Sequence, residues 1–179
     1  NTVSVIETAT NTVIAAVPVA RTPTGVAMTP DGAFAYVTNL LSGTVSVIAT
    51  ATNAVTATVP VGDSPRGMAI TPDGAFAYVT NQGSSTVSVI GTATNTVVAT
   101  VPVGTSPFTV TISPDGAFAY VTNANSNTVS VIGGQSDPAP GNNSASDVAF
   151  VSSYPPCESP TFAGPTAFPL GTSNIGLIA

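Results

Sequence analysis

Histidine and lysine are absent from this chain, and charge of either sign is scarce. Two arginines and eight acidic residues are spread over 179 positions, so charged residues make up only 6% of the chain. So few basic residues argue against nucleic acid, whose phosphates are bound largely by lysine and arginine, and against polybasic attraction to an anionic membrane. Missing histidine removes the commonest general base and metal ligand. Because the acidic residues cluster at no catalytic or ligand spacing, we expect no catalytic residues, no metal and no cofactor.

Cysteine and long apolar runs are also lacking. The single cysteine, Cys157, gives no disulfide framework. We predict a buried small side chain there, with an intermolecular disulfide as the alternative. No apolar run approaches the roughly 20 residues of a membrane-spanning helix, and the longest, Val13–Ala20, contains Pro18. Because the chain starts at Asn1 with neither a methionine nor a signal peptide, we expect it to be processed or a fragment of something longer.

What the chain does have is an internal repeat of 42 residues. The segment Thr29–Asn39 returns unchanged at Thr71–Asn81, and again at Ser113–Asn123 with serine in place of the first threonine. A second segment, Thr-Val-Ser-Val-Ile, keeps the same period and begins at Thr2, Thr44, Thr86 and Thr128. Self-similarity at this period is typical of repeat arrays and propellers.

Each copy of the first segment carries a Pro-Asp-Gly sequence, with its acidic residue at Asp31, Asp73 or Asp115. An aspartate repeated three times could be a ligand or metal site. Turn chemistry alone explains it, because proline presets φ, aspartate bonds its own backbone and glycine accepts positive φ. We interpret the three aspartates as hairpin turns.

Short alternating segments bounded by glycine, proline or asparagine fill each repeat. In the first copy they are Thr2–Ile6, Thr12–Val19, Gly25–Thr29 and Ala33–Thr38. Four such strands in 42 residues leave no room for a helix. The sequence therefore predicts an all-β fold of propeller-type blades with four antiparallel strands, in which residues 1–132 form about three repeats of a partial propeller.

The repeat stops after residue 132. Residues 133–146 have the composition of a Gly/Pro/Ser/Asn linker, and Asn142 begins a candidate glycosylation sequon. Residues 147–179 are apolar and interrupted by prolines, unlike disordered tails. We predict an extended segment that docks on its own or a neighbouring subunit, with Asp147–Val151 as a strand donor. A floppy terminus is the alternative.

Three copies of one tetrapeptide, at Tyr36–Asn39, Tyr78–Asn81 and Tyr120–Asn123, together with Val59–Gly62 and the turn and strand segments above, resemble the YVTN-type β-propeller repeat. The resemblance covers residues 1 to about 132. It implies seven-bladed rings in secreted or surface-layer proteins of bacteria and archaea, related in fold to lactonase-like propellers. The enzymes among those relatives use acidic, asparagine or histidine groups lining a channel, and no such constellation can be carried over to this chain.

These features favour a non-enzymatic extracellular or cell-surface structural protein that assembles head to tail into a filament or surface array. The expected partners are copies of the chain itself, with glycans as further candidates. An alternative is a ligand- or partner-binding fragment of a larger seven-bladed propeller, and a lactonase-like hydrolase is the reading least supported. Arg21 and Arg66 are interpreted as isolated solvated charges, with a binding pair across neighbouring blades as the alternative.

The head-to-tail hypothesis names an assembly interface. It rests on strand segments that would leave open edges at both ends of the repeats, and on apolar residues of the tail. The candidate residues are Thr2, Val3, Val5, Ile6, Thr128, Val129, Val131, Ile132, Val148, Phe150, Phe162 and Phe168.

Overall fold

The computed structural model describes residues 1–133, which form thirteen β-strands and no helix. The strands are β1 (Thr2–Glu7), β2 (Thr12–Pro18), β3 (Pro23–Met28), β4 (Phe34–Asn39), β5 (Thr44–Ala49), β6 (Ala54–Pro60), β7 (Pro65–Ile70), β8 (Phe76–Asn81), β9 (Thr86–Gly91), β10 (Thr96–Pro102), β11 (Pro107–Ile112), β12 (Phe118–Asn123) and β13 (Thr128–Gly133). The predicted all-β fold is confirmed. Within this part of the chain, no helix suited to crossing a bilayer was found.

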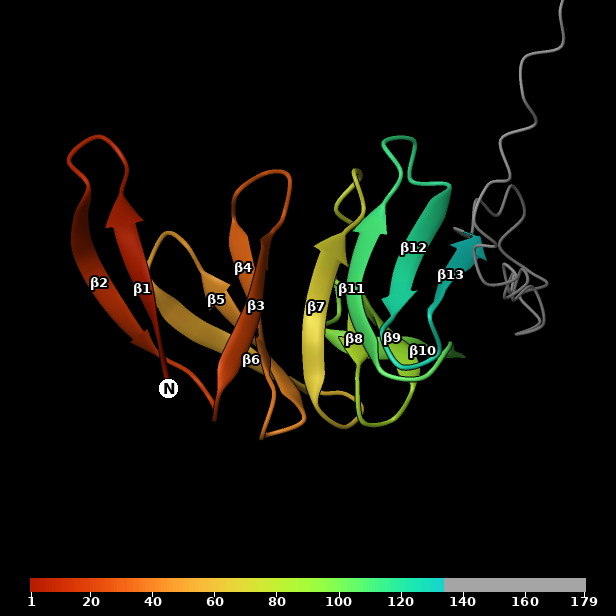
Figure 1. Ribbon diagram of the computed structural model, residues 1–179. Helices are drawn as coiled ribbons and strands as arrows, with labels where there is room; N and C mark the ends of the chain where they lie inside the picture. The colour runs from red at the N-terminus through yellow and green to blue at the C-terminus, as the bar shows by residue number, and fades with distance from the viewer. Residues whose placement is uncertain (134–179) are drawn as a thin grey trace, which may run out of the picture.

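The strands form four antiparallel sheets that follow one another along the chain (Figure 1). We call β1–β2 the partial blade, β3–β6 the first blade, β7–β10 the second blade and β11–β13 the third blade. Within each sheet the strands are neighbours in chain order. The strands β3, β7 and β11 are the innermost strands of their blades and lie side by side. This is the predicted partial propeller, with two complete four-stranded blades.

The innermost strands begin earlier than the sequence indicated. Strand β3 starts at Pro23, not Gly25, because Pro23 pairs with Asn39 across an irregularity in the ladder before Gly25. It also ends before Thr29, since that residue belongs to the turn and its N–H donates to the carbonyl of Phe34 at 2.9 Å. The alternating pattern of apolar and polar residues does not reveal the bulge, because the extra residue of a bulge leaves the amino-acid composition of the strand unchanged.

The Pro-Asp-Gly segments are turns, as predicted. In the first copy the carboxylate of Asp31 accepts a bond from the Thr29 hydroxyl at 2.6 Å and from the Ala33 N–H at 2.9 Å. Gly32 has φ of 72°, a conformation that glycine adopts without strain. Asp73 and Asp115 make the equivalent bonds. These contacts give each aspartate a structural role in its turn. Within residues 1–133 no group of three or more potential metal ligands occurs.

These bonds predict a loss of stability in acid. The hydroxyl of Thr71 and then the N–H of Ala75 lower the pKa of Asp73 below its usual 3.8. A carboxylate whose pKa is lower in the folded state stabilises the fold above its unfolded pKa, and this contribution disappears as pH falls through the folded value. The Asp73→Asn variant should therefore have a lower Tm than the parent at pH 7, and the difference should shrink below about pH 4. Thermal melts from pH 7 to pH 2 measure this, and a constant difference would contradict it.

Adjacent blades are held together by apolar clusters. Tyr36 and Val45 of the first blade pack against Val79 and Ile90 of the second. The buried Tyr36 hydroxyl donates to the side-chain carbonyl of Asn95 at 2.6 Å, in the loop between β9 and β10. A second cluster joins the second and third blades, and its residues occupy nearly the same positions of the repeat as those of the first cluster. Each blade therefore presents one face to the blade before it and one to the blade after it.

Side-chain hydroxyls of the second strand of one blade also bond to the innermost strand of the next blade. The Thr38 hydroxyl donates to the carbonyl oxygen of Arg66 at 2.8 Å, and Thr80 donates to that of Phe108 at 3.2 Å. Both threonines are fully buried. Because these bonds reach the backbone at equivalent positions of the repeat, they hold β7 against the first blade and β11 against the second in the same way.

Candidate functional site

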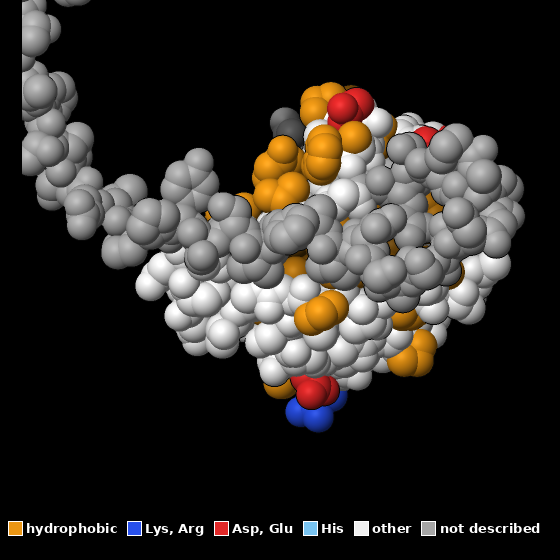
Figure 2. Space-filling view, turned by 90° about the vertical axis from the view of Figure 1, so that its right-hand side faces the viewer, with side chains coloured by type: hydrophobic (Ala, Val, Ile, Leu, Met, Phe, Trp, Pro, Cys, Tyr) orange, Lys and Arg blue, Asp and Glu red, His pale blue; other side chains and the backbone are white. Residues whose placement is uncertain are grey.

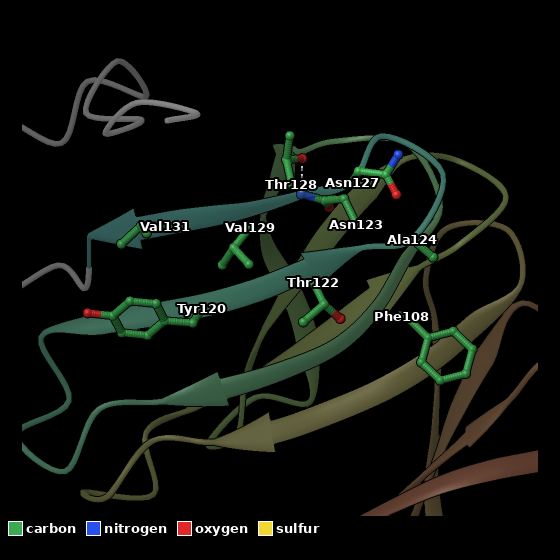
Figure 3. Close-up of a pocket in the computed structure, with 9 residues that line it drawn as sticks. All are labelled: Phe108, Tyr120, Thr122, Asn123, Ala124, Asn127, Thr128, Val129 and Val131. Carbon is green, nitrogen blue, oxygen red and sulfur yellow. Dashed lines mark hydrogen bonds between the residues drawn. The ribbon is translucent and has the colours of Figure 1, made fainter. Parts of the chain in front are cut away.

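A hollow lies on the face of the third blade that no further blade covers in residues 1–133 (Figure 3). Its volume is about 740 Å³, and the surface is mostly apolar. Figure 3 shows Tyr120, Val129 and Val131 on neighbouring strands along its floor, with Phe108 at the edge. The remaining lining residues are Thr122, Asn123, Ala124, Asn127 and Thr128.

Comparison of the repeats shows that this hollow is a blade-packing face. Tyr36 and Tyr78 are 1% and 7% exposed because the following blade covers them, whereas the equivalent Tyr120 is 42% exposed. Val45 is fully buried in the first blade, whereas Val129, at the same position of the third blade, is 45% exposed. The chemistry of the face is therefore that of an interface between blades, and we do not assign a small-molecule site to it.

Figure 2 looks at the molecule from this end. Hydrophobic side chains gather in groups on the visible surface, and charged side chains are few. This agrees with the charge-poor composition of the chain.

A polar and aromatic cluster lies where β7 and β11 begin. Arg66 is the second residue of β7, Phe108 is the second residue of β11, and Gln82 follows β8 directly. The Nε–H group of Arg66 donates to the side-chain carbonyl of Gln82 at 2.5 Å. The central carbon of the same guanidinium lies 4.8 Å from the centre of the Phe108 ring. A cation over an aromatic face at this distance is attracted by the ring quadrupole.

These contacts orient the guanidinium but use only the donor on its Nε atom. Stacking on Phe108 fixes the plane of the group, and Gln82 takes the one donor on Nε. Arginine carries five N–H donors in a rigid fork that matches a carboxylate or phosphate. Within residues 1–133 the two terminal amino groups of Arg66 have no hydrogen-bond partner. Arg66 is half-buried, and a charge in such a position is less screened than one in bulk water.

The two arginines of the chain are therefore not alike. Arg21 is exposed and lies in the loop before β3, where its backbone N–H donates to the Ser42 hydroxyl at 2.9 Å. Arg66 is not the isolated solvated charge that the sequence suggested. Aligning the repeats would have placed Thr24, Arg66 and Phe108 in one row of adjacent strands, but only the fold brings Gln82 to the guanidinium.

The predicted assembly residues are divided between buried and exposed positions. Val3 and Val5 pack against the first blade, whereas Ile6 is exposed. Ile132 is buried in the core between the second and third blades, and the Thr128 hydroxyl accepts a bond from the Asn123 amide at 3.1 Å. Thr2 is exposed in β1, and Val129 and Val131 line the open face of the third blade.

Several predictions fall outside the described residues. They concern the linker, the tail from Asp147 to Ala179, the sequon at Asn142 and the environment of Cys157. The tail residues Val148, Phe150, Phe162 and Phe168 belong to the same group. Strand β13 extends to Gly133, the residue at which the linker was predicted to begin.

The fold defines the chain as a β-propeller repeat protein. Residues 2–97 match the family described as lactonase, 7-bladed beta-propeller. Because this match covers more than half of the chain, the chain belongs to that family. No match was found among curated protein sequences.

Solved structures show the same architecture. Hydrazine synthase from Kuenenia stuttgartiensis is 36% identical over 63% of this chain and 32% of its own, with a TM-score of 0.61. A functionally unknown protein from Desulfotomaculum acetoxidans is 23% identical over 74% of this chain and 44% of its own, with a TM-score of 0.66. A proposed 6-phosphogluconolactonase from Bacteroides fragilis is 25% identical over 62% of this chain and 34% of its own, with a TM-score of 0.57. The chain thus spans less than half the length of each structure.

Two predictions from the sequence are contradicted by these findings. The prediction of a non-enzymatic structural protein that assembles into a filament or surface array is wrong, because the chain belongs to a lactonase family and is similar to a proposed 6-phosphogluconolactonase. The prediction that the chain is not an enzyme is contradicted by the same matches. The prediction rested on the lack of histidine and of clustered acidic residues, and that lack does not exclude a chain from this family. The findings support the alternative of a ligand-binding part of a larger seven-bladed propeller.

Proposed function

We propose that the chain is part of a lactonase-type propeller that binds an anionic lactone, a cyclic ester carrying a phosphate or carboxylate group. The observation that carries this proposal is the Arg66 guanidinium, which is oriented by Gln82 and Phe108 and keeps its terminal donors for a ligand. The Bacteroides fragilis protein supports the ligand class, because its name specifies a phosphorylated sugar lactone. The repeats are proposed to be of the YVTN type. A secreted or surface location is proposed as well, with the charge-poor composition as its support.

Arg66 has a definite role in this proposal. Hydrolysis of a lactone adds water across the ester bond, opens the ring and places negative charge on the carbonyl oxygen in the transition state. A fixed cation that binds the anionic group of the substrate holds the ring in one orientation, and hydrogen bonds to charged groups are stronger than neutral ones. The stacked and bonded guanidinium requires little reorganisation when the ligand arrives, which favours affinity.

The proposal predicts a difference between the two arginines in ligand binding. Calorimetric titration of the full chain with 6-phosphogluconate, the ring-opened product of such a lactone, should give measurable binding. The Arg66→Gln variant should weaken it by about 10- to 100-fold, since a hydrogen bond to a charged group contributes about 1.5–3 kcal/mol. Arg21→Gln is the matched control, because it removes the same charge from an exposed loop. Its affinity should stay within about twofold of the parent.

Two outcomes would contradict this assignment. Equal loss of affinity in both variants would mean that net charge alone attracts the ligand, and an unchanged affinity in Arg66→Gln would remove Arg66 from the site. Gluconate, which lacks the phosphate, should bind more weakly than 6-phosphogluconate to the parent, and this preference should be reduced in Arg66→Gln. Release of acid from 6-phosphogluconolactone above the uncatalysed rate, followed at constant pH, tests the reaction itself.

A further inference from the structure

The third blade has a strand position that residues 1–133 do not fill. In the first and second blades the fourth strand pairs with the third, as β6 does with β5 and β10 with β9. Strand β13 holds the third position of its blade, and within the described residues it pairs with β12 alone. A strand edge of this kind presents a row of backbone donors and acceptors suited to another strand.

The outer strands of the other blades share one short sequence in one register. Each contains Ala-x-Val, with alanine and valine paired to two valines of the strand before it. In the first blade Ala57 pairs with Val47 and Val59 pairs with Val45. In the partial blade Ala15 pairs with Val5 and Val17 pairs with Val3. In the second blade Ala99 pairs with Val89 and Val101 pairs with Val87. Ala-x-Val also occurs in β4, β8 and β12, but there the alanine pairs with an isoleucine and the valine with a serine. Pairing with two valines therefore distinguishes the outer strands, and Val129 and Val131 of β13 stand at the positions of Val45 and Val47.

The same pattern occurs once in residues 134–179, at Ala149-Phe150-Val151. The repeat would have placed the outer strand of the third blade at residues 138–144, but Pro138, Pro140 and Gly141 stand there. Two prolines and a glycine within seven residues remove ladder donors and leave little side chain to pack, which disfavours a regular strand even at the edge of a sheet. The Ala-x-Val segment is thus displaced along the sequence by a longer connection, which costs little in loop entropy.

We infer that Asp147–Val151 adds to β13 as the fourth strand of the third blade, with Ala149 opposite Val131 and Val151 opposite Val129. The register follows from the three observed outer strands. The edge of β13 receives the same backbone partner that completes the first and second blades. The chain continues directly from the end of β13 at Gly133, so the donor segment is tethered to the strand it completes.

Disulfide trapping tests this pairing in the full chain. In a Cys157→Ser background, the pair Val131→Cys and Ala149→Cys should form an intramolecular disulfide under mild oxidation, because directly opposed strand residues lie within disulfide range. The matched control is Val131→Cys with Val148→Cys, whose side chains would point to opposite faces of the sheet. We expect at least tenfold more cross-linked monomer in the first pair, measured by non-reducing electrophoresis and intact mass.

Every outcome decides the question. A disulfide that joins two molecules would show that a second copy supplies the strand, and equal cross-linking in both pairs would show that the segment is not held in register; either result overturns the inference. Hydrogen exchange on the unmodified chain needs no variant. Amides of residues 147–151 should exchange at least tenfold more slowly than those of residues 134–146, and equally fast exchange would also overturn it.

Discussion

Replacing Gly67 with alanine is expected to lower the free energy of unfolding by about 3 kcal/mol, near the upper end of overpacking effects. A Cβ at this position would lie 2.6 Å from the carbonyl oxygen of Phe108 and 2.9 Å from the Cα of Thr109. Both atoms belong to the backbone of β11, so no side-chain rotation relieves the contact. The two innermost strands would have to move apart, which would also stretch the bond from Thr80 to Phe108.

The repeat supplies the control for this prediction. Thr109 occupies the position of Gly67 in the third blade and is exposed. Thr109→Ala should therefore change the free energy of unfolding by less than about 1 kcal/mol. Urea denaturation followed by circular dichroism measures both variants. If Gly67→Ala were as mild as Thr109→Ala, the close approach of β7 to β11 would be wrong.

The second large effect is expected from a charge placed in the core between blades. Val45→Asp should lower the free energy of unfolding by about 4 kcal/mol, because it buries a carboxylate with no partner. Val45 packs in the cluster that joins the first and second blades. The loss is enough to unfold a domain of ordinary stability, so the variant should show a much lower Tm or no cooperative transition.

Val129→Asp is the matched control, because Val129 stands at the same position of the third blade on the open face. Its effect should be below about 1 kcal/mol, since the carboxylate stays in water. Comparable damage from the two substitutions would show that the face of the third blade is covered in the protein. Thermal and urea unfolding of both variants, at several protein concentrations, distinguish these results.

The sequence predicted the architecture well because the fold is periodic. Identical segments repeated every 42 residues require identical local structure, so recognising one strand and one turn, such as the Pro-Asp-Gly turn at Asp31, fixes the others. What periodicity could not supply was the difference between equivalent positions. Tyr36 and Tyr120 stand in identical segments, yet only the first is covered by a following blade. Burial depends on neighbours in space, which the repeat unit does not encode.

The polar cluster was harder to predict for a related reason. Arg66 replaces a threonine and Phe108 replaces an arginine at one position of successive repeats, and such departures are visible only when the repeats are aligned. Even then, the partner on Nε is Gln82, which is contributed by a loop at a different position of the repeat. Arg66 belongs to no histidine or carboxylate motif, and its orientation by Gln82 and Phe108 can be recognised only in the folded chain.

The bond from Tyr36 to Asn95 has a consequence for the order in which the protein can fold during synthesis. The two residues are far apart in the chain, so the first blade can complete its core only after the ribosome has made nearly all of the second. Domains emerge from the ribosome starting at the N-terminus, at about 5–20 residues per second. Each newly made blade is thus expected to spend a few seconds with an uncovered apolar face before the next blade is made to cover it.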